Sequence, residues 1–300
     1  MASLEDYFGG NPAGTGMCLM DLSGVAVSAA KAQAAAFGTD VVELGFLRHM
    51  ILNSLLANRK KFRHDYPELI IACDSKANWR KVKHPFYKAH RSAAKEADSF
   101  DWDEYFRLFS IIKEEIRQVF PFKMVEVEGA EGDDIIGVLT SQYKGRNVLI
   151  HAKDSDFNQC CRLPNVKIWS PFKQAIIVDT DAEANLFTKI CRGETGDGIP
   201  NILSVNNSFV DKIRQKALRE TKIDEWRANG IPTDELMERF LENQELIDFR
   251  YIPKELRQEI VDTYEATKSM DSKQKIFAYL TQKELAKIST TFLSDIEALT

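Results

Sequence analysis

The stretch NVLIHAKDSDFN, residues 147–158, joins a short apolar run to two aspartates that are one residue apart. The run VLI is typical of a buried strand, and Asp154 and Asp156 follow at its carboxyl end. Like charges held close together repel each other, so a strand that runs out onto two carboxylates needs an explanation. The rest of the chain repeats this arrangement.

Other apolar runs along the chain also end in acidic residues. MCLMD (17–21) ends in Asp21 and ELIIACD (68–74) ends in Asp74, while KMVEVEG (123–129) alternates like a strand. Helical patterns lie between these runs, at 41–63, 103–120 and 131–144. Strands that alternate with helices and are apolar throughout predict an α/β fold, with a mostly parallel central sheet flanked by helices.

This fold would gather the acids. Ligands of open α/β sheets bind beyond the carboxyl ends of the strands, and EGDD (131–134) begins a helix just after a strand, where the helix dipole favours carboxylates. Each aspartate taken alone is an ordinary turn former or helix cap. Their recurrence at successive strand ends instead indicates a site for two Mg²⁺ ions, for which Mn²⁺ can substitute. Sites of this kind serve phosphodiester hydrolysis. The candidate ligands are Asp21, Asp74, Glu131, Asp133, Asp134, Asp154 and Asp156.

Charge is segregated along the chain. Its 40 Lys and Arg against 45 Asp and Glu give a net charge of −5. Residues 75–95 nevertheless contain no acid and carry Lys76, Arg80, Lys81, Lys83, Lys88, Arg91 and Lys95. Such a segment indicates a surface that grips phosphate; a solvated lysine-rich loop is the alternative.

A glycine-rich turn lies farther along, in KICRGETGDGIPNI, residues 189–202. Gly196 and Gly198 permit backbone conformations with positive φ, and Pro200 is placed to begin a helix. One interpretation is a loop whose backbone approaches a nucleic-acid phosphate while Asp197 reaches the metal site. The other is a simple corner between two helices.

Composition excludes several protein classes. No apolar run approaches the roughly 20 residues that span a bilayer, and acids stand where a signal peptide has bases. The five cysteines show no CxxC spacing, which argues against disulfides and zinc. We therefore expect a cytoplasmic protein that does not contact membranes.

The carboxyl-terminal part reads as helical. We expect an α/β domain over residues 1–188 and a smaller all-helical lobe over 189–300 that contains the glycine turn. A stripe near the end of the chain is expected to pack in the core, or else to dock a partner protein. It consists of Ile276, Leu280, Leu285, Ile288, Phe292 and Ile296.

Six motifs, in this order, resemble those of the structure-specific 5′ nucleases, the flap endonuclease and 5′→3′ exonuclease superfamily. The resemblance covers nearly the whole chain and is weakest between about 203 and 241. The motifs are MDLS (20–23), CDSKANWR (73–80), YKAHR (87–91), EGDD (131–134), KDSDFNQ (153–159) and GETGDGIPNI (193–202).

The resemblance implies that residues 75–100 form a basic helical arch and that the glycine turn is a helix–hairpin–helix-type loop. A single-stranded-DNA-binding protein would be the partner that docks on the terminal stripe. The protein would be a monomer and, if it is viral, would act in the cytoplasm of the host cell.

The resemblance also implies residue roles. The acids above, with Asp197, would hold two Mg²⁺ ions, some of them through water. Lys88 would touch the scissile phosphate as a catalytic residue, helped by Arg80, and Tyr87 would either stack on a base or pack within the arch. The expected nucleic-acid-binding residues are Arg80, Lys83, Tyr87, Lys88, Arg91, Gly196 and Gly198.

The chain departs from the family pattern at a few positions. The family usually has aspartate at position 194, asparagine at 198 and glycine at 201, where this chain has Glu194, Gly198 and Asn201. Residues 204–218 lack a second glycine hairpin, which makes tight binding of downstream duplex less certain than cleavage. Gly132 replaces the usual alanine, with little expected effect.

The function predicted from the sequence is a Mg²⁺-dependent 5′→3′ nuclease. Its expected substrates are RNA–DNA hybrids and nicked, flapped or duplex DNA, and its expected role is to remove RNA primers during phage DNA replication. Two alternatives are a small-molecule phosphohydrolase, which has no use for a basic arch, and a non-catalytic nucleic-acid clamp, which gains nothing from a cluster of acids.

Overall fold

The computed structural model describes residues 16–269 and 273–285 of the chain. Within them, six strands form one sheet in the order β3-β2-β1-β4-β5-β6. Five strands are parallel and β6 pairs antiparallel at the edge, which confirms the predicted mostly parallel sheet. The strands are β1 (Met17–Asp21), β2 (Glu68–Cys73), β3 (Lys123–Glu126), β4 (Val148–His151), β5 (Val166–Ser170) and β6 (Ala175–Ile177).

The strand order reverses at β1. From this central strand the chain first builds outward through β2 and β3, and later returns to the other side of β1 through β4 and β5. The point where an open parallel sheet reverses its order leaves a crevice at the carboxyl ends of the strands. Here the order reverses between β1, which ends at Asp21, and β4, which is followed by Asp154.

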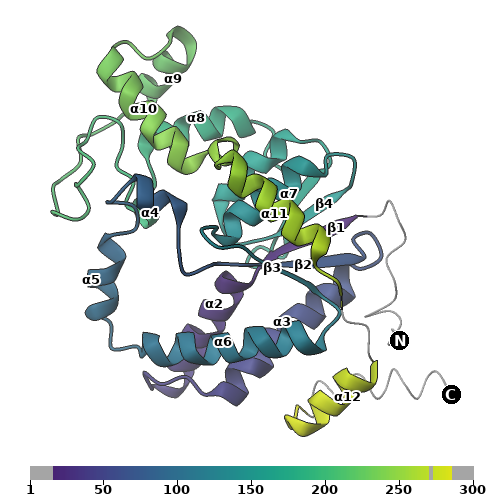
Figure 1. Ribbon diagram of the computed structural model, residues 1–300. Coiled ribbons are helices and arrows are strands. Elements are labelled where there is room, and N and C mark those ends of the chain that lie inside the picture. Colours follow the sequence, from purple (N-terminus) through teal and green to yellow (C-terminus); the bar gives the residue numbers. More distant parts are fainter. Residues whose placement is uncertain (1–15, 270–272, 286–300) are drawn as a thin grey trace.

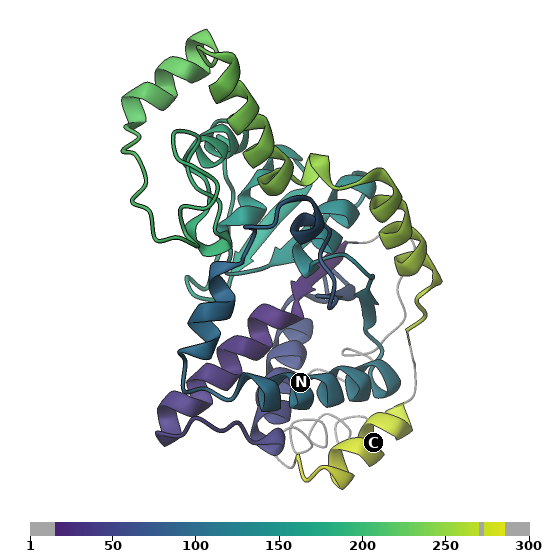
Figure 2. The same ribbon diagram turned by 60° about the vertical axis from the view of Figure 1, so that its left-hand side comes forward.

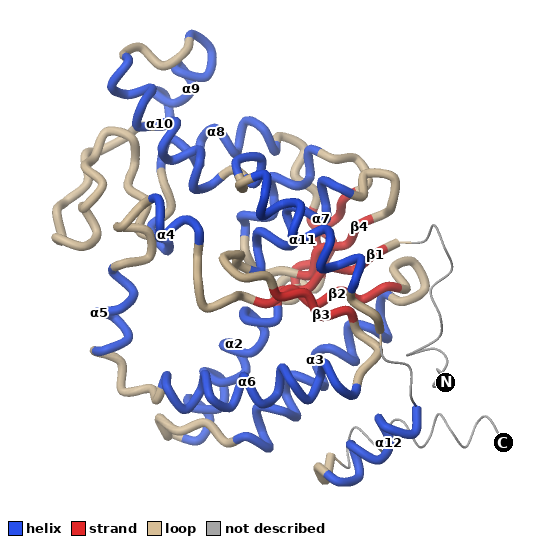
Figure 3. The backbone as a smooth tube through the Cα atoms, viewed as in Figure 1, coloured by secondary structure: helices blue, strands red, loops and turns tan. Residues whose placement is uncertain are grey.

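Helices cover both faces of the sheet, as Figures 1 and 3 show. Alternation along the strands separates the two cores: Cys18 and Met20 of β1 face one side, while Met17 and Leu19 face the other. One core is closed by α2 (Leu22–Phe37), α3 (Leu44–Phe62) and α6 (Trp102–Val119), and the other by α7 (Gly132–Gln142) and α11 (Lys254–Ala266).

Helices α3, α6 and α7 lie where the periodicity predicts them, but the sequence analysis does not predict α2. Its sequence, LSGVAVSAAKAQAAAF, is dominated by alanine and lacks a clear apolar period, although alanine is the best helix former. Asp21 caps this helix by accepting hydrogen bonds from the backbone N–H of Ser23 and Gly24. The same aspartate therefore ends β1 and begins α2.

The basic segment forms the predicted arch. Helices α4 (Trp79–Lys83) and α5 (His90–Glu96) connect the end of β2 to α6 along one side of the molecule, and Figure 2 shows them from another direction. Asn78 caps α4 by accepting from the N–H of Arg80. We call residues 75–100 the arch.

The carboxyl-terminal part is only partly a separate lobe. A third core joins α8 (Ala182–Arg192), α9 (Glu220–Asn229) and α10 (Asp234–Ile247), whereas α11 packs on α7 and β3. Helix α8 runs through the predicted boundary at 188–189, which stays a prediction. Residues 198–219 are irregular and not helical.

The last helix of the described residues, α12 (Lys273–Gln282), contacts α6. Ile276, Leu280 and Leu285 of the predicted stripe are buried in the core with α3 and α6. Ile288, Phe292 and Ile296 lie outside the described residues. No helix within 16–269 or 273–285 is long and apolar enough to cross a membrane.

Candidate active site at the carboxyl ends of the strands

Four carboxylates meet at the carboxyl edge of the sheet, and we call them the acidic rim: Asp21, Asp74, Asp133 and Asp154. They follow β1, β2, β3 and β4, with Asp133 in the first turn of α7. The backbone N–H of Gly132 donates to Asp74 Oδ1 at 2.7 Å. A methyl group on Gly132 would lie 3.4 Å from Asp74 Oδ1 and 3.5 Å from Asp21 Oδ1, so both carboxylates flank the start of α7.

The rim is electrostatically unbalanced. Burial, followed by the charge of Asp74, raises the pKa of Asp21 to about 7, although hydrogen bonds from the backbone oppose the shift. Burial and the charge of Asp21 also hold the pKa of Asp133 well above its usual value. Within the described residues, no ion pair joins any rim carboxylate to a Lys, Arg or His. Such a cluster opposes its own ionisation unless cations enter.

The rim has the chemistry of a cation site, without a finished ligand cage. In the part of the chain that the structure describes, no three His, Cys, Asp or Glu side chains already stand in metal-binding geometry. Carboxylate oxygens are nevertheless the hard donors that Mg²⁺ and Mn²⁺ select. The donor set and its repulsion therefore fit a divalent cation, and the assignment of individual ligands stays a prediction.

Glu131 and Asp197 are neutralised by the base of the arch. Lys88 Nζ lies 2.5 Å from Glu131 Oε1, and the Tyr87 hydroxyl oxygen lies 2.8 Å from Glu131 Oε2 and 2.9 Å from Asp197 Oδ2, so its one proton is shared between the two carboxylates. Arg91 lies 2.7 Å from Asp197 Oδ1. Although burial alone would raise it, Lys88 and Arg80 hold the pKa of Glu131 below its usual value. The arch thus closes on the acids that border the rim.

Tyr87 and Lys88 are shaped by this contact. Tyr87 is buried, which favours the packing interpretation over stacking on a base. Lys88 has φ of +55°, and its N–H donates to the carbonyl of Asp197 at 2.7 Å. A non-glycine residue in this conformation is strained, and such strain is concentrated at functional sites. The ion pair with Glu131 and the backbone hydrogen bond to Asp197 hold Lys88 in this conformation.

Asp156 has a partner that the sequence analysis misses. Lys189 of α8 forms an ion pair with Asp156, and its Nζ lies 3.0 Å from Glu194 Oε2. Burial, with a contribution from Asp154, raises the pKa of Asp156 to about 6, and Lys189 opposes this rise. The available signal was a lysine in the last turn of a helix that leads into the glycine turn.

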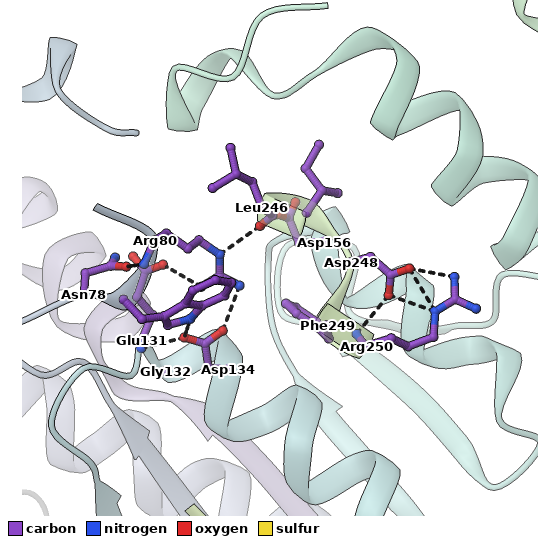
Figure 4. A network of polar contacts seen from close by, with 12 residues as sticks. Asn78, Arg80, Glu131, Gly132, Asp134, Asp156, Leu246, Asp248, Phe249 and Arg250 are labelled. Carbon is purple, nitrogen blue, oxygen red and sulfur yellow. Dashed lines mark hydrogen bonds and ion pairs between the residues drawn. The ribbon is translucent and has the colours of Figure 1, made fainter. Parts of the chain in front are cut away.

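The structure places Arg80 and Asp134 away from the predicted roles of phosphate clamp and metal ligand. Arg80 is only 3% exposed, and its guanidinium lies 2.7 Å from Asp134 Oδ1 and 3.1 Å from Glu131 Oε2. Asp134 is fully buried and accepts from Trp79 Nε1 and from the N–H of Glu131. Figure 4 shows this network, in which Arg80 also donates to the carbonyl of Leu246. A buried charge is stable only when it is paired, so we interpret both residues as the framework behind the rim.

The glycine turn faces the arch. Gly198 has φ of +72°, and a Cβ there would lie 2.7 Å from His90 Nδ1. The carbonyl of Gly196 accepts from Arg91 Nε at 2.8 Å. Lys83 is exposed on α4 and pairs with Glu245. These contacts join the turn to the arch, and the phosphate contacts predicted for Lys83, Gly196 and Gly198 stay predictions.

Asn201, one departure from the family pattern, has a structural explanation. Its buried side chain accepts from the N–H of Leu203 and the hydroxyl of Ser204, and donates to the carbonyl of Lys216. Asn201 therefore connects the two ends of the irregular segment 198–219, the part of the chain in which the sequence lacks a second glycine hairpin.

The chain is similar in sequence to known protein families and to one known protein. Residues 30–189 match the family described as 5′-3′ exonuclease, N-terminal resolvase-like domain, and residues 180–294 match the family described as T4 RNase H, C terminal. The ribonuclease H of Enterobacteria phage T4 is 30% identical over 292 residues, covering 92% of this chain and 94% of that protein.

Solved structures share the fold at low sequence identity. The 5′-exonuclease of bacteriophage T5 with bound zinc has a TM-score of 0.56 and 13% identity, covering 84% of this chain and 99% of that one. A substituted T5 flap endonuclease in a pseudo-enzyme-product complex with DNA and metal ions has a TM-score of 0.59 and 14% identity, covering 83% of this chain and 99% of that one.

Proposed function

Because this chain belongs to the 5′-3′ exonuclease family and is a 5′→3′ structure-specific nuclease, we propose that the acidic rim is the centre at which it hydrolyses phosphodiesters. The observation that carries this proposal is the meeting of the four rim carboxylates at one edge of the sheet, directly beside the base of the arch and with no ion pair to any described residue.

The centre uses two divalent cations, Mg²⁺ by choice and Mn²⁺ as a substitute. Support comes from the repulsion among the rim carboxylates and from the T5 structures, which are described with bound zinc and with metal ions. Bound cations would offset the carboxylate charge, polarise the scissile phosphate and activate the attacking water. The residues that hold them are the rim carboxylates, with Glu131, Asp156 and Asp197 at its border; Asp134 is left out because it is buried against Arg80.

Basic side chains of the protein bind the substrate. Lys88 and Arg91 stand at the border of the rim, where their amine and guanidinium groups are placed to exchange a carboxylate for a phosphate oxygen. Lys83 and the other exposed bases of the arch extend this positive surface. The chain residues thus orient the phosphate while the rim supplies the hydrolytic chemistry.

The substrates we propose are RNA–DNA hybrids and nicked, flapped or duplex DNA, cut from the 5′ end. Support comes from the name of the T4 relative, ribonuclease H, and from the DNA in the T5 complex. The role that follows is removal of RNA primers from lagging-strand fragments in phage replication. We propose action as a monomer, with a single-stranded-DNA-binding protein as a candidate partner.

The test uses a 5′-labelled RNA primer annealed to DNA and, separately, a 5′-flap DNA. We expect cleavage with Mg²⁺, none with EDTA, and a loss of at least ~100-fold in Asp133→Asn, since a Lewis-acid site is worth several kcal/mol. The matched control is Asp103→Asn, which removes an exposed carboxylate on α6 and should cleave like the native protein.

Other outcomes would contradict the proposal in distinct ways. Cleavage in EDTA, or undiminished cleavage by Asp133→Asn, would separate the rim from the chemistry. Binding without cleavage would leave the clamp alternative. Turnover of a simple phosphate ester without cutting of the polymer would leave the small-molecule phosphohydrolase.

A further inference from the structure

We propose that Gln159 is a positioning residue for the nuclease reaction. Its side-chain amide fixes the loop that carries Asp156 against the junction between α10 and η3 (Phe249–Tyr251), which we call the 246–249 junction. The proposal deepens the proposed function and rests on it, because the loop positioned by Gln159 borders the acidic rim.

The amide of Gln159 is fully engaged. The side chain is 4% exposed; Nε2 donates at 3.0 Å to the carbonyl of Asp156 and at 3.0 Å to the carbonyl of Ile247, and Oε1 accepts at 2.9 Å from the N–H of Phe249. Two donors and an acceptor on one planar group are required, and a neutral amide supplies them. Glutamate would lack both donors, and methionine would lack all three groups.

The bonded backbone groups need such a partner. Ile247 is the last residue of α10, where helix carbonyls have no partner within the helix. Phe249 begins η3, and Asp156 lies in the first turn of η1 (Ser155–Arg162). Buried polar groups without hydrogen bonds destabilise the folded state. Gln159 satisfies the two groups at the helix ends, the carbonyl of Ile247 and the N–H of Phe249, and also bonds the carbonyl of Asp156. It thereby ties the segment that carries Asp156 to the carboxyl-terminal part of the chain.

The same junction supports the other side of the site. The carbonyl of Leu246 accepts from Arg80 Nε at 2.8 Å, and the guanidinium of Arg80 holds Glu131 and Asp134 at the start of α7. Figure 4 shows Arg80 reaching Leu246 on one side and the α7 acids on the other. The 246–249 junction is therefore a common support for the two acidic segments, one through Arg80 and the other through Gln159.

Groups that orient the ligands of a metal site from behind change metal affinity or activity by about 10–100-fold when they are removed. Gln159 acts on Asp156 through its main chain, so its loss should misplace the carboxylate without changing the arch. Substrate binding and metal response should then separate: KM for DNA stays, while kcat falls and more metal is needed.

The experiment compares native protein and Gln159→Met by two readouts. One is the rise in Tm with increasing Mg²⁺ or Mn²⁺, which requires no activity; the other is kcat and KM on a 5′-flap DNA. We expect Gln159→Met to need about 10–100-fold more metal for the same rise in Tm, with a lower kcat and an unchanged KM.

Two controls isolate the positioning role. Gln33→Met places methionine at another glutamine that is 4% exposed, within α2. Tyr264→Phe removes a buried hydrogen bond at the opposite edge of the sheet, so it lowers stability independently of the site. Both should keep the native metal response. If Gln159→Met does not fold, Gln159→Asn, whose shorter amide cannot span the same three groups, is measured in the same way.

The outcomes separate the two claims. A lower Tm with the native metal response in the Gln159 variant would overturn the positioning role and leave only a structural one. A native protein that shows a metal-dependent rise in Tm but cuts no substrate would overturn the proposed function, while the metal response of the variant would still decide the role of Gln159.

Discussion

The predicted metal ligands differ in the charges around them. Asp21, Asp74, Asp133 and Asp154 have no ion pair within the described residues, whereas Glu131, Asp134, Asp156 and Asp197 each pair with a lysine or arginine. The unpaired group is the part of the site that is incomplete without added cations. The paired group is already neutralised by the protein itself.

The unpaired group makes stability depend on pH when metal is absent. Asp21 keeps its proton in the folded protein up to about pH 7, but an unfolded aspartate loses it near pH 3.9. The folded state therefore binds more protons between these values, and its stability falls as pH rises from about 4 to 7. In EDTA, this fall should be smaller by about 1–2 kcal/mol in Asp21→Asn, which keeps one of the two hydrogen bonds of the helix cap.

Urea unfolding at pH 5 and pH 7.5 measures this effect. Asp103→Asn, which lies away from the rim, is the matched control and should keep the native dependence. An identical fall in native protein and Asp21→Asn would show that repulsion at the rim does not govern stability. Saturating Mg²⁺ should remove most of the difference between native protein and Asp21→Asn in how far the free energy of unfolding falls from pH 5 to pH 7.5.

Gly132 offers a second prediction, since alanine is usual at this position in the family. A methyl group there meets the oxygens of Asp74 and Asp21 at ordinary contact distances, so Gly132→Ala should retain activity and gain about 0.5–1 kcal/mol in stability. Gly193→Ala is the contrast: φ is +71° and the added Cβ would lie 2.2 Å from the carbonyl oxygen of Ile199. Thermal unfolding should show opposite shifts, and equal shifts would contradict this account.

Among the elements, α11 has a specific anchor at the sheet edge opposite the rim. The hydroxyl of Tyr264 lies 2.9 Å from both oxygens of Glu68, which also pairs with Lys123 and Arg146. These charged partners hold the pKa of Glu68 below its usual value although burial opposes this. The contact fixes α11 across β2 and β3.

Removing the Tyr264 hydroxyl should lower stability by about 1–2 kcal/mol, the low end for a hydrogen bond to a charged group, since Glu68 keeps its two bases. Denaturant unfolding of Tyr264→Phe measures this change. Tyr251→Phe removes the hydroxyl of an exposed tyrosine and should stay within about 0.5 kcal/mol of the native protein. A similar loss in both variants would contradict the anchor.

Elements with strong periodicity were predictable, and those without it were not. Helix α6 carries a clear apolar stripe and lies at its predicted place, whereas α2 is a run of alanine and was missed. The irregular segment 198–219 was expected to be helical, but Asn201 and Ser204 bind its backbone in a form that no period records. Tertiary contacts decide such segments.

Across the whole molecule, the net charge is acidic but the arch is basic, so cation binding and phosphate binding would use separate parts of the protein. If the arch grips phosphates, log Kobs for DNA should fall linearly with log salt. Lys81→Gln, on exposed α4, should weaken binding and reduce the slope by about 0.9, the value for one phosphate contact. Lys144→Gln makes the same charge change after α7, at the opposite edge of the sheet, and should leave the slope unchanged. Equal slopes in both variants would contradict a specific role of the arch.

At this scale the rim was predictable, because one rule about strand ends places Asp21, Asp74 and Asp154 together. The partners of the site were not. Lys189 reaches Asp156, and Gln159 reaches the 246–249 junction, each across a long stretch of sequence. Arg80 is likewise bonded to the carbonyl of the distant Leu246. Contacts between distant segments leave no local pattern.

The position of the 246–249 junction in the chain has a consequence for biosynthesis. A ribosome completes the rim acids, Arg80 and Gln159 long before it reaches residue 249, so in the nascent chain Arg80 and Gln159 still lack their partners at Leu246, Ile247 and Phe249. The support that this junction gives to the two acidic segments is therefore added only late in translation.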